Sequence, residues 1–347
     1  LNRLELTPAN AGSDDRYKKI VIHEQAVEQL FVDLFLQAHR KAPKRIVLDL
    51  DATDDPLHGD QLGKFFHGYY KHYCYLPLYI FCEGWPLLAQ LRPSNRDASA
   101  GSVDHLQRIV ARLRKAWPEV RIVIRGDSGF CRERIMRWCE ENGVDFVLGL
   151  AKNTRLKRAL GKELHEAKEL FEQTGRPARV FKDFEYRTRK SWSRPRRVIG
   201  KAEHLRQGAN PRFVVTSLPA DRVDGRTLYE ERYCARGDME NRIKEQQLFL
   251  FADRTSTHGM RSNQLRLLFS TIAYLLHHVL REYGLKGTGL ANAQAGTIRT
   301  RLLKIGAQIR VSVRRVWISL SESYPYQALF ERILENLRRQ TPHPLRV

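Results

Sequence analysis

The sequence is short of acidic residues for its length, and this shortage excludes a neutral metabolic enzyme. Its 347 residues carry 39 Asp and Glu against 60 Lys and Arg, a formal net charge of +21. Such a surplus on a folded chain favours a polyanionic partner, because each neutralised phosphate releases bound counterions. We therefore expect nucleic acid as the partner, with an acidic membrane surface as the second choice.

Cysteines and long apolar runs are also scarce. The five cysteines are odd in number and include no Cys-x-x-Cys pair, which argues against a disulfide framework and a zinc ribbon and favours the cytoplasm. The longest apolar stretch, residues 267–280, is shorter than the roughly 20 residues of a membrane span, so we predict a core helix and no membrane. The chain has no signal peptide and opens with Leu1, from which we expect a piece of a longer protein.

The pattern of apolar residues predicts an α/β fold. Helical spacing covers residues 26–40, 102–116 and 133–141, and strand-like runs cover residues 45–53, 72–82, 86–94, 120–130 and 146–151. The second and third runs are separated by a short turn and read as an antiparallel hairpin. This order predicts a mixed five-stranded sheet with flanking helices.

The composition changes after residue 151. Residues 152–228 hold 20 Lys and Arg against 9 Asp and Glu and combine one helix with short polar strands, which predicts a basic, mostly β insertion. Helices are expected over 229–251, 260–283 and 326–339, and a strand over 311–320. We predict five segments: an N-terminal helical remnant of a DNA-binding region (1–44), the first part of a catalytic core (45–151), the insertion (152–228), a helical completion of the core (229–283) and a basic C-terminal region (284–347).

Two carboxylates end the first and the fourth strand of this expected sheet. Asp51 ends the run at 45–53 and Asp127 ends the run at 120–130, so adjacent strands would bring both to one edge. Magnesium takes oxygen ligands, and two such ions about 3.5–4 Å apart can activate a nucleophile and stabilise a leaving oxygen on phosphorus. Asp and Glu at strand ends, without a His or Cys cluster, therefore predict a magnesium site for phosphodiester chemistry.

A third ligand is expected from a helix near that edge. Glu240 lies in a basic segment of helical pattern, and Tyr233, Arg236 and Lys244 fall on the same helical face. A phenol, a guanidinium and an ammonium around a carboxylate are suited to gripping phosphate. The alternative is a surface ion pair between Glu240 and Lys244 four residues on.

These segments together resemble the three catalytic blocks of a known family. LDLDATDDPLHG, IRGDSGF and Tyr-x-x-Arg-x-x-x-Glu are similar to those of the DDE transposases, in the insertion-sequence 4-like group and most closely its insertion-sequence 1380 branch. The similarity runs from about residue 2 to the C-terminal end. It implies a ribonuclease H-like core interrupted by a β insertion, and metal-dependent cut-and-paste transposition.

The resemblance also assigns roles to residues. Asp51, Asp127 and Glu240 would be the catalytic ligands of two Mg²⁺ ions, which Mn²⁺ can replace. Tyr233 and Arg236 would contact phosphates near the transposon end. The family's Lys seven residues after the Glu is Gln247 here, and Lys244 is the candidate substitute.

The resemblance implies further partners. They are double-stranded DNA, as terminal inverted repeats and as target, and a second copy of the chain in a synaptic complex. The setting would be the bacterial cytoplasm, associated with the nucleoid. Family members also carry an N-terminal DNA-binding segment, most of which we expect to be missing here.

Further DNA contacts are expected in the insertion. Trp192 lies among basic residues, and an aromatic ring flanked by Arg can stack on an unpaired base. We count Arg194, Arg196 and Arg197 with it as candidate DNA-binding residues. The alternative is that Trp192 packs inside the small β region.

Other interpretations remain open from the sequence. Asp49 shares a strand face with Asp51 and is a rival ligand or a supporting group. An Asp-rich turn after a strand and a Gly-Asp-Ser-Gly turn also occur without function. The rival functions are a ribonuclease H-like DNA nuclease and an inactive or host-adopted DNA-binding protein.

Overall fold

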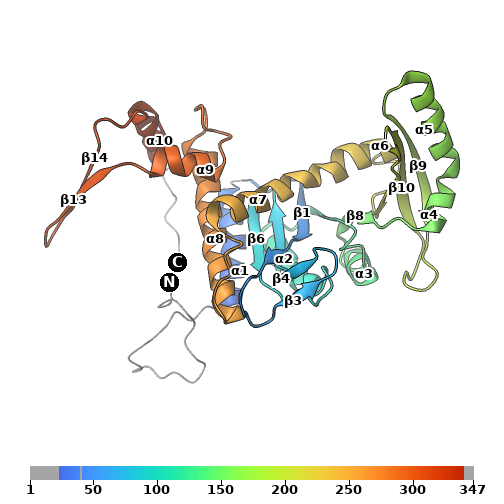
Figure 1. Cartoon of the computed structure of the whole chain (residues 1–347), viewed down its shortest axis with the longest axis horizontal. Coiled ribbons are helices and arrows are strands. Elements are labelled where there is room, and N and C mark those ends of the chain that lie inside the picture. Colours follow the sequence, from blue (N-terminus) through green and yellow to red (C-terminus); the bar gives the residue numbers. More distant parts are fainter. Residues whose placement is uncertain (1–22, 40, 340–347) are drawn as a thin grey trace. The chain divides into compact units, whose positions relative to one another are not determined.

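The computed structural model describes residues 23–39 and 41–339 (Figure 1). The chain divides into two compact units. The first unit comprises Leu1–Asn241 and Ser256–Leu265, and the second comprises Arg242–Thr255 and Arg266–Val347. Half of the expected N-terminal remnant, residues 1–22, lies outside the described residues. The five predicted segments are not the units of this division, and their boundaries stay a prediction.

The described part of the first unit is built on one mixed sheet of nine strands. The path is β11-β10-β12-β8-β7-β1-β5-β6, and β9 pairs with β10 beside it. The strands are β1 (Arg45–Ala52), β5 (Leu78–Cys82), β6 (Trp85–Gln90), β7 (Arg121–Gly126), β8 (Asp145–Leu150), β9 (Ala178–Tyr186), β10 (Arg196–Leu205), β11 (Gly208–Ala209) and β12 (Arg212–Thr216). β1, β7 and β8 run parallel, whereas β5 and β6 add on antiparallel. The predicted mixed α/β sheet is confirmed.

The predicted insertion does not form a sheet of its own. Its strand β12 pairs antiparallel with β8, from Phe213 opposite Leu150 to Thr216 opposite Val147. The edge of β8 is thereby covered, so an unpaired row of backbone groups is avoided. The sheet therefore continues from the expected five strands into the basic region.

One predicted strand is two in the structure. Residues 72–82 split into β4 (His72–Tyr75) and β5, because Pro77 between them cannot donate a ladder hydrogen bond. β4 belongs to a small separate sheet with β2 (Asp55–Pro56) and β3 (Phe65–His67). This small sheet follows directly on the end of β1.

Helices cover the sheet with their apolar faces. α2 (Ser102–Ala116) buries Val103, Leu106, Ile109, Val110 and Leu113, the spacing that places side chains on one helical face. α3 (Glu133–Glu141) ends before Gly143, whose positive φ of 59° suits a glycine. The remaining helices before residue 228 are α1 (Glu24–Ala38), α4 (Thr154–Ala159), α5 (Gly161–Thr174) and α6 (Gly225–Thr227). α5 packs on β9 and β10.

The segment after α6 changes its helical type twice. It runs through η2 (Leu228–Tyr233), a π-helical turn, and η3 (Cys234–Arg236), a 3₁₀ turn, into α7 (Gly237–Leu250). The predicted single helix over 229–251 is therefore three pieces. Leu228 and Tyr229 are buried against Val123 of β7 and Val147 of β8, so η2 lies over one face of the sheet.

The second unit is mainly helical. It contains the last part of α8 (Met260–Val279), η4 (Leu280–Gly284), α9 (Ala295–Ile298), η5 (Arg299–Leu303) and α10 (Gln327–Arg339). The predicted strand over 311–320 is a hairpin instead, with β13 (Ala307–Val311), a turn held by Ser312 N donating to Arg315 O, and β14 (Val316–Leu320). Within the part of the chain that is described, the helices are too short or too polar to cross a bilayer.

Candidate active site

The parallel pairing of β1 and β7 brings Asp51 and Asp127 to one edge of the sheet. Leu50 lies opposite Gly126 in the register, and each Asp is the next residue along its strand direction. Side-chain hydrogen bonds fix both carboxylates: Asp51 Oδ1 accepts from Ala52 N at 2.9 Å, and Asp127 Oδ1 accepts from Gly129 N at 2.8 Å. The structure therefore places two of the three predicted metal ligands at the same edge of the sheet.

The helical segment brings the other predicted residues to the same edge. Arg236 Nη2 lies 2.6 Å from Glu240 Oε1. The hydroxyl of Tyr233 lies against Gly149 of β8, because a Cβ built there would be 2.5 Å from it. Arg236 also hydrogen-bonds to the Tyr233 side chain. Glu240 is thus paired with Arg236 four residues before it, and not with Lys244 as the alternative interpretation proposed.

The predicted carboxylates interact electrostatically with Arg236 and with one another. Burial raises the pKa of Asp51 to about 6, the Arg236 guanidinium opposes the rise, and the Asp127 and Glu240 carboxylates add to it. The pKa of Arg236 is raised although its burial acts to lower it, because Glu240, Asp51, Tyr233 and Asp127 surround the guanidinium. The three predicted carboxylates therefore lie within electrostatic reach of one another, around one cation.

In the structure, the three carboxylates do not form a complete metal-binding site. Among the described residues, no group of three or more His, Cys, Asp or Glu is arranged to hold an ion. Arg236 instead supplies the positive charge between the acids. The donor chemistry nonetheless fits a hard divalent cation, because the coupled set of Asp51, Asp127 and Glu240 offers carboxylate oxygens only.

Asp49, the rival ligand, is engaged elsewhere. Arg125 holds it through two contacts, Nε to Oδ1 at 2.5 Å and Nη2 to Oδ2 at 2.7 Å. The Asp49 residue is 6% exposed, and Arg125 Nη1 also donates to the backbone oxygen of Arg232 at 2.6 Å. Asp49 therefore anchors η2 to the sheet through Arg125, which is the supporting role that sequence left open.

The sequence analysis missed Tyr70. Its hydroxyl donates to the backbone oxygen of Ala52 at 3.3 Å, next to Asp51. Burial raises its pKa, and the carboxylates of Asp54, Asp51 and Asp127 contribute to the rise. A second phenol thus borders the site, and only the Tyr-rich turn at residues 69–73 hinted at it.

Trp192 is not brought to this site by any described contact. It is 4% exposed and meets Tyr186 edge-on, with 5.7 Å between ring centroids. The Arg196 guanidinium lies 5.5 Å from its ring centroid. These surroundings favour the alternative in which Trp192 packs the β region, because a buried ring presents no face to a base.

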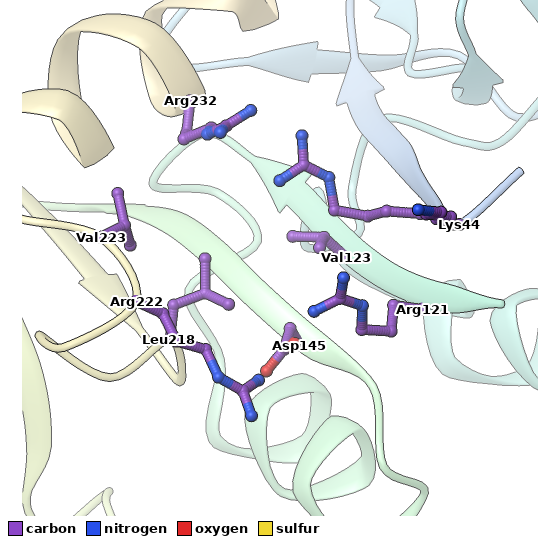
Figure 2. Close-up of a pocket in the computed structure, with 9 residues that line it drawn as sticks. Lys44, Arg121, Val123, Asp145, Leu218, Arg222, Val223 and Arg232 are labelled. Carbon is purple, nitrogen blue, oxygen red and sulfur yellow. The ribbon is translucent and has the colours of Figure 1, made fainter. Parts of the chain in front are cut away.

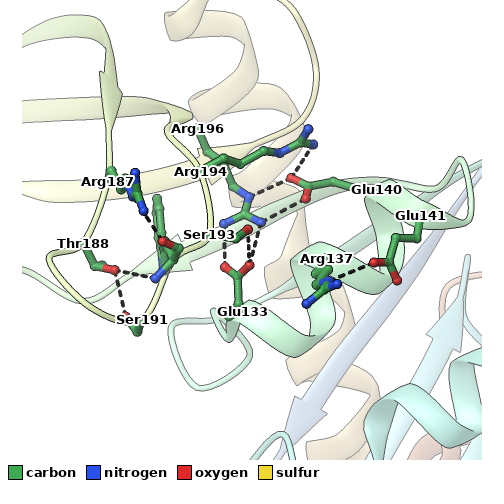
Figure 3. Close-up of polar contacts among 11 residues, drawn as sticks. Glu133, Arg137, Glu140, Glu141, Arg187, Thr188, Ser191, Ser193, Arg194 and Arg196 are labelled. Atoms are coloured by element: carbon green, nitrogen blue, oxygen red, sulfur yellow. Dashed lines mark hydrogen bonds and ion pairs between the residues drawn. The ribbon is translucent and has the colours of Figure 1, made fainter.

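The three insertion arginines are engaged by protein groups. Arg196 bridges Glu133 and Glu140 on α3, with its Nη1 2.7 Å from Glu133 Oε2 and its Nε 2.7 Å from Glu140 Oε1 (Figure 3). Arg194 Nη2 lies 2.8 Å from Glu140 Oε1. Arg197 holds Asp183 and donates to the backbone oxygens of Leu218 and Val223. Arg196 thus fastens the basic region to α3, whereas Arg197 holds parts of the basic region to one another. Lys244 is exposed on α7.

Coupled acids beside an arginine and a tyrosine are typical of enzymes that act on phosphate esters. The chain belongs to the family described as Transposase DDE domain group 1, whose model matches residues 1–342. The predicted resemblance to the DDE transposases is thereby confirmed at the level of the family. The insertion-sequence 1380 branch stays a prediction.

A solved structure titled as a piggyBac transposase synaptic complex with hairpin DNA is similar at 11% identity and a TM-score of 0.43. The match covers 93% of this chain and 59% of that one, so this chain spans less than two thirds of that relative. No curated protein matches the chain.

Proposed function

We propose that this chain carries out cut-and-paste transposition of an insertion sequence, cleaving DNA at the element's ends and joining those ends to target DNA. The observation that carries the proposal is the electrostatic coupling of Asp51, Asp127 and Glu240 around Arg236. Membership of the DDE family supports it. A ribonuclease H-like core is the fold interpretation that goes with it, supported by three parallel strands, of which β1 and β7 lead into Asp51 and Asp127 at their carboxyl ends.

In this proposal Asp51, Asp127 and Glu240 hold two Mg²⁺ ions. Bound cations would supply an activated water or 3′ hydroxyl and charge neutralisation at the leaving oxygen. Asp51, with a pKa of about 6, is mostly ionised at neutral pH as a ligand must be. Arg236 exchanges its contact with Glu240 for a phosphate oxygen of the DNA, and its charge makes that hydrogen bond strong.

Tyr233 and Tyr70 would position the DNA. A Tyr233 hydroxyl of raised pKa stays protonated at neutral pH, so it can donate to a phosphate oxygen. Tyr70 stays protonated for the same reason, and by giving up its hydrogen bond to Ala52 it can donate to a second phosphate oxygen or a water. The substrates are duplex DNA, as terminal inverted repeats and as target, and a homodimer would hold two ends together, in the cytoplasm beside the bacterial nucleoid.

A strand-transfer assay tests this proposal. The full chain is incubated with Mg²⁺, labelled duplex carrying a candidate terminal repeat, and a target plasmid. Joined product supports transposition, whereas cut product without joining indicates the nuclease. Shifted but intact DNA indicates the DNA-binding protein without catalysis. Repeating the assay with Mn²⁺ tests the choice of ion.

A further inference from the structure

We propose that a basic hollow at the opposite ends of β1 and β7 binds the phosphate backbone of duplex DNA, on the same sheet face as the candidate active site. This inference rests on the proposed function, because it extends the path of the same DNA. The hollow has a volume of about 590 Å³. We call it the cation hollow, and it is lined by Lys44, Arg45, Arg121, Val123, Asp145, Leu218, Arg222, Val223 and Arg232.

Five of these nine lining residues are cationic and one is acidic (Figure 2). All five cations are exposed, and none of them forms an ion pair with a described residue. The Arg125, Arg196 and Arg197 guanidiniums, by contrast, each hold a carboxylate. The one acid, Asp145, accepts a hydrogen bond from Ser217 Oγ at 2.9 Å. The cation hollow therefore concentrates positive charge that the described protein leaves uncompensated.

Strand pairing forces two of these cations together. Arg45 lies directly opposite Arg121 in the parallel register of β1 and β7. Like charges placed opposite each other in a sheet are destabilising. Burial, Arg232 and Arg121 together lower the pKa of Arg45, in that order of size. An unfavourable pair of this kind at an exposed hollow points to an anionic ligand, since an anion between the guanidiniums removes the repulsion.

The cation hollow and the candidate active site share one face of the sheet. Alternate residues of a strand point to the same side, so two in-register rows run along that face from the cations to the acids. The rows are Arg45, Val47, Asp49 and Asp51 on β1, beside Arg121, Val123 and Arg125 on β7, with Asp127 directly after the end of β7.

Between the two sites this face is crossed by η2. Its neighbouring residues Arg232 and Tyr233 serve one site each: Arg232 lines the cation hollow, and Tyr233 contacts Arg236 at the active site. Arg125 of β7 holds η2 on the sheet by donating a hydrogen bond to the Arg232 backbone oxygen. The same short helical turn therefore borders both the cation hollow and the candidate active site.

The spacing fits a duplex better than a small anion. Arg45 and Asp51 are six residues apart on β1, which is about 20 Å at about 3.3 Å per residue. Duplex DNA advances about 3.4 Å per base pair, so this distance corresponds to roughly six base pairs. About half a helical turn from a scissile phosphate at Asp51, the backbone that faces the same protein surface is that of the complementary strand, and its phosphates would lie at the cation hollow.

The test measures duplex binding without metal, so that catalysis plays no part. Fluorescence anisotropy of a labelled 30-base-pair duplex is recorded in EDTA over a salt series for the full chain. Arg45→Gln/Arg121→Gln is expected to reduce the slope of log affinity against log salt by about 2, near 0.9 for each lost phosphate contact. The control Lys115→Gln/Lys162→Gln removes the same charge from two exposed helical residues and is expected to keep the parent slope.

The outcomes separate the alternatives. An unchanged slope in Arg45→Gln/Arg121→Gln, or an equal loss in the control, overturns the inference. A third result would also overturn it: the parent binds inorganic triphosphate, the double variant does not, and duplex binding by the double variant keeps the parent slope. The cation hollow would then be a small-anion site. If the parent cleaves no DNA but the double variant still loses slope, the proposed function fails and this inference stands. Thermal unfolding should show the double variant at least as stable as the parent, since a repulsive pair is removed.

Discussion

Arg236 Nη2 contacts Glu240 Oε1 at 2.6 Å, so a guanidinium holds one of the three carboxylates proposed as metal ligands. The same cation opposes the pKa rise of Asp51. Three acids brought together by folding repel one another, and a fixed positive charge among them offsets the repulsion. In the proposed function, a bound divalent cation would take over this role from Arg236.

Replacing Arg236 by a neutral residue should make the stability of the protein depend on added Mg²⁺. We expect Arg236→Gln to lower the free energy of unfolding by about 1–3 kcal/mol without metal, because three carboxylates lose their counter-charge. Mg²⁺ at 10 mM should then raise the melting temperature more in the variant than in the parent, since binding to the folded state is stabilising. Differential scanning fluorimetry measures both quantities.

The control for this experiment is another Arg–Glu pair one helical turn apart. Arg137 Nε lies 2.8 Å from Glu141 Oε1 on α3, and both side chains are exposed. Arg137→Gln should change stability by less than about 0.5 kcal/mol and leave the Mg²⁺ response as in the parent. An Arg236→Gln protein whose response to Mg²⁺ equals that of Arg137→Gln would show that no ion enters among these acids.

Gly149 is required for the placement of Tyr233. A Cβ at this position would lie 2.5 Å from the Tyr233 hydroxyl and 2.9 Å from the backbone nitrogen of Ser128. We expect Gly149→Ala to cost about 1–3 kcal/mol of stability and to reduce DNA cleavage, because Ser128 adjoins Asp127. Urea unfolding and the cleavage assay measure the two effects.

Gly161 provides the matched substitution. It begins α5, and a Cβ added to it would meet nothing within 4 Å. Gly161→Ala should leave cleavage unchanged and stability equal or up to about 1 kcal/mol higher. If Gly149→Ala behaved like Gly161→Ala in both assays, Tyr233 would have no fixed place at the site.

The Glu133–Arg196 contact makes stability depend on acid pH. Burial acts to raise the pKa of Glu133, but hydrogen bonds from Arg196 and Ser193 outweigh it and lower the pKa to about 2. A lowered folded-state pKa stabilises the protein above the unfolded value near 4.5, and this stability is lost as pH falls toward 2. We expect Glu133→Gln to cost about 2 kcal/mol at pH 7, with the difference from the parent shrinking below pH 4.5.

Chemical unfolding at a series of pH values checks this dependence. Glu141→Gln is the control on the same helix, because Glu141 forms an exposed pair with Arg137 and should cost less than about 0.5 kcal/mol. A Glu133→Gln penalty that is constant from pH 7 to 3 would contradict the account. The outcome also tests whether Arg196 acts as a structural link rather than as a DNA contact.

Local patterns in the sequence predict much of the fold. The helices over 102–116 and 133–141 have the bounds of α2 and α3, because amphipathic spacing and the Asn-Gly stop are local signals. Asp51 and Asp127 could be placed at strand ends for the same reason. Their convergence was expected on the condition that the two strands lie side by side, and the structure shows that they pair.

Other features depend on contacts between residues far apart in the chain. The pairing of β12 with β8 and the juxtaposition of Arg45 with Arg121 arise only when strands find their register, and no local periodicity encodes that choice. The burial of Trp192 likewise depends on Tyr186 and Arg196, whereas its basic neighbours in sequence suggested exposure. The switch of helical type before α7 had no signal in the apolar spacing.

The central claim is that Asp51, Asp127 and Glu240 act together in one metal-dependent site. Cleavage of a labelled terminal-repeat duplex in Mg²⁺ is compared for the parent, Asp51→Asn, Asp127→Asn, Glu240→Gln and the exposed control Glu231→Gln, with duplex binding in EDTA measured alongside. The account predicts that each of the three variants loses at least about a thousandfold in rate with duplex binding retained, whereas Glu231→Gln cleaves as the parent does. Cleavage at the parent rate by any one of the three would contradict it.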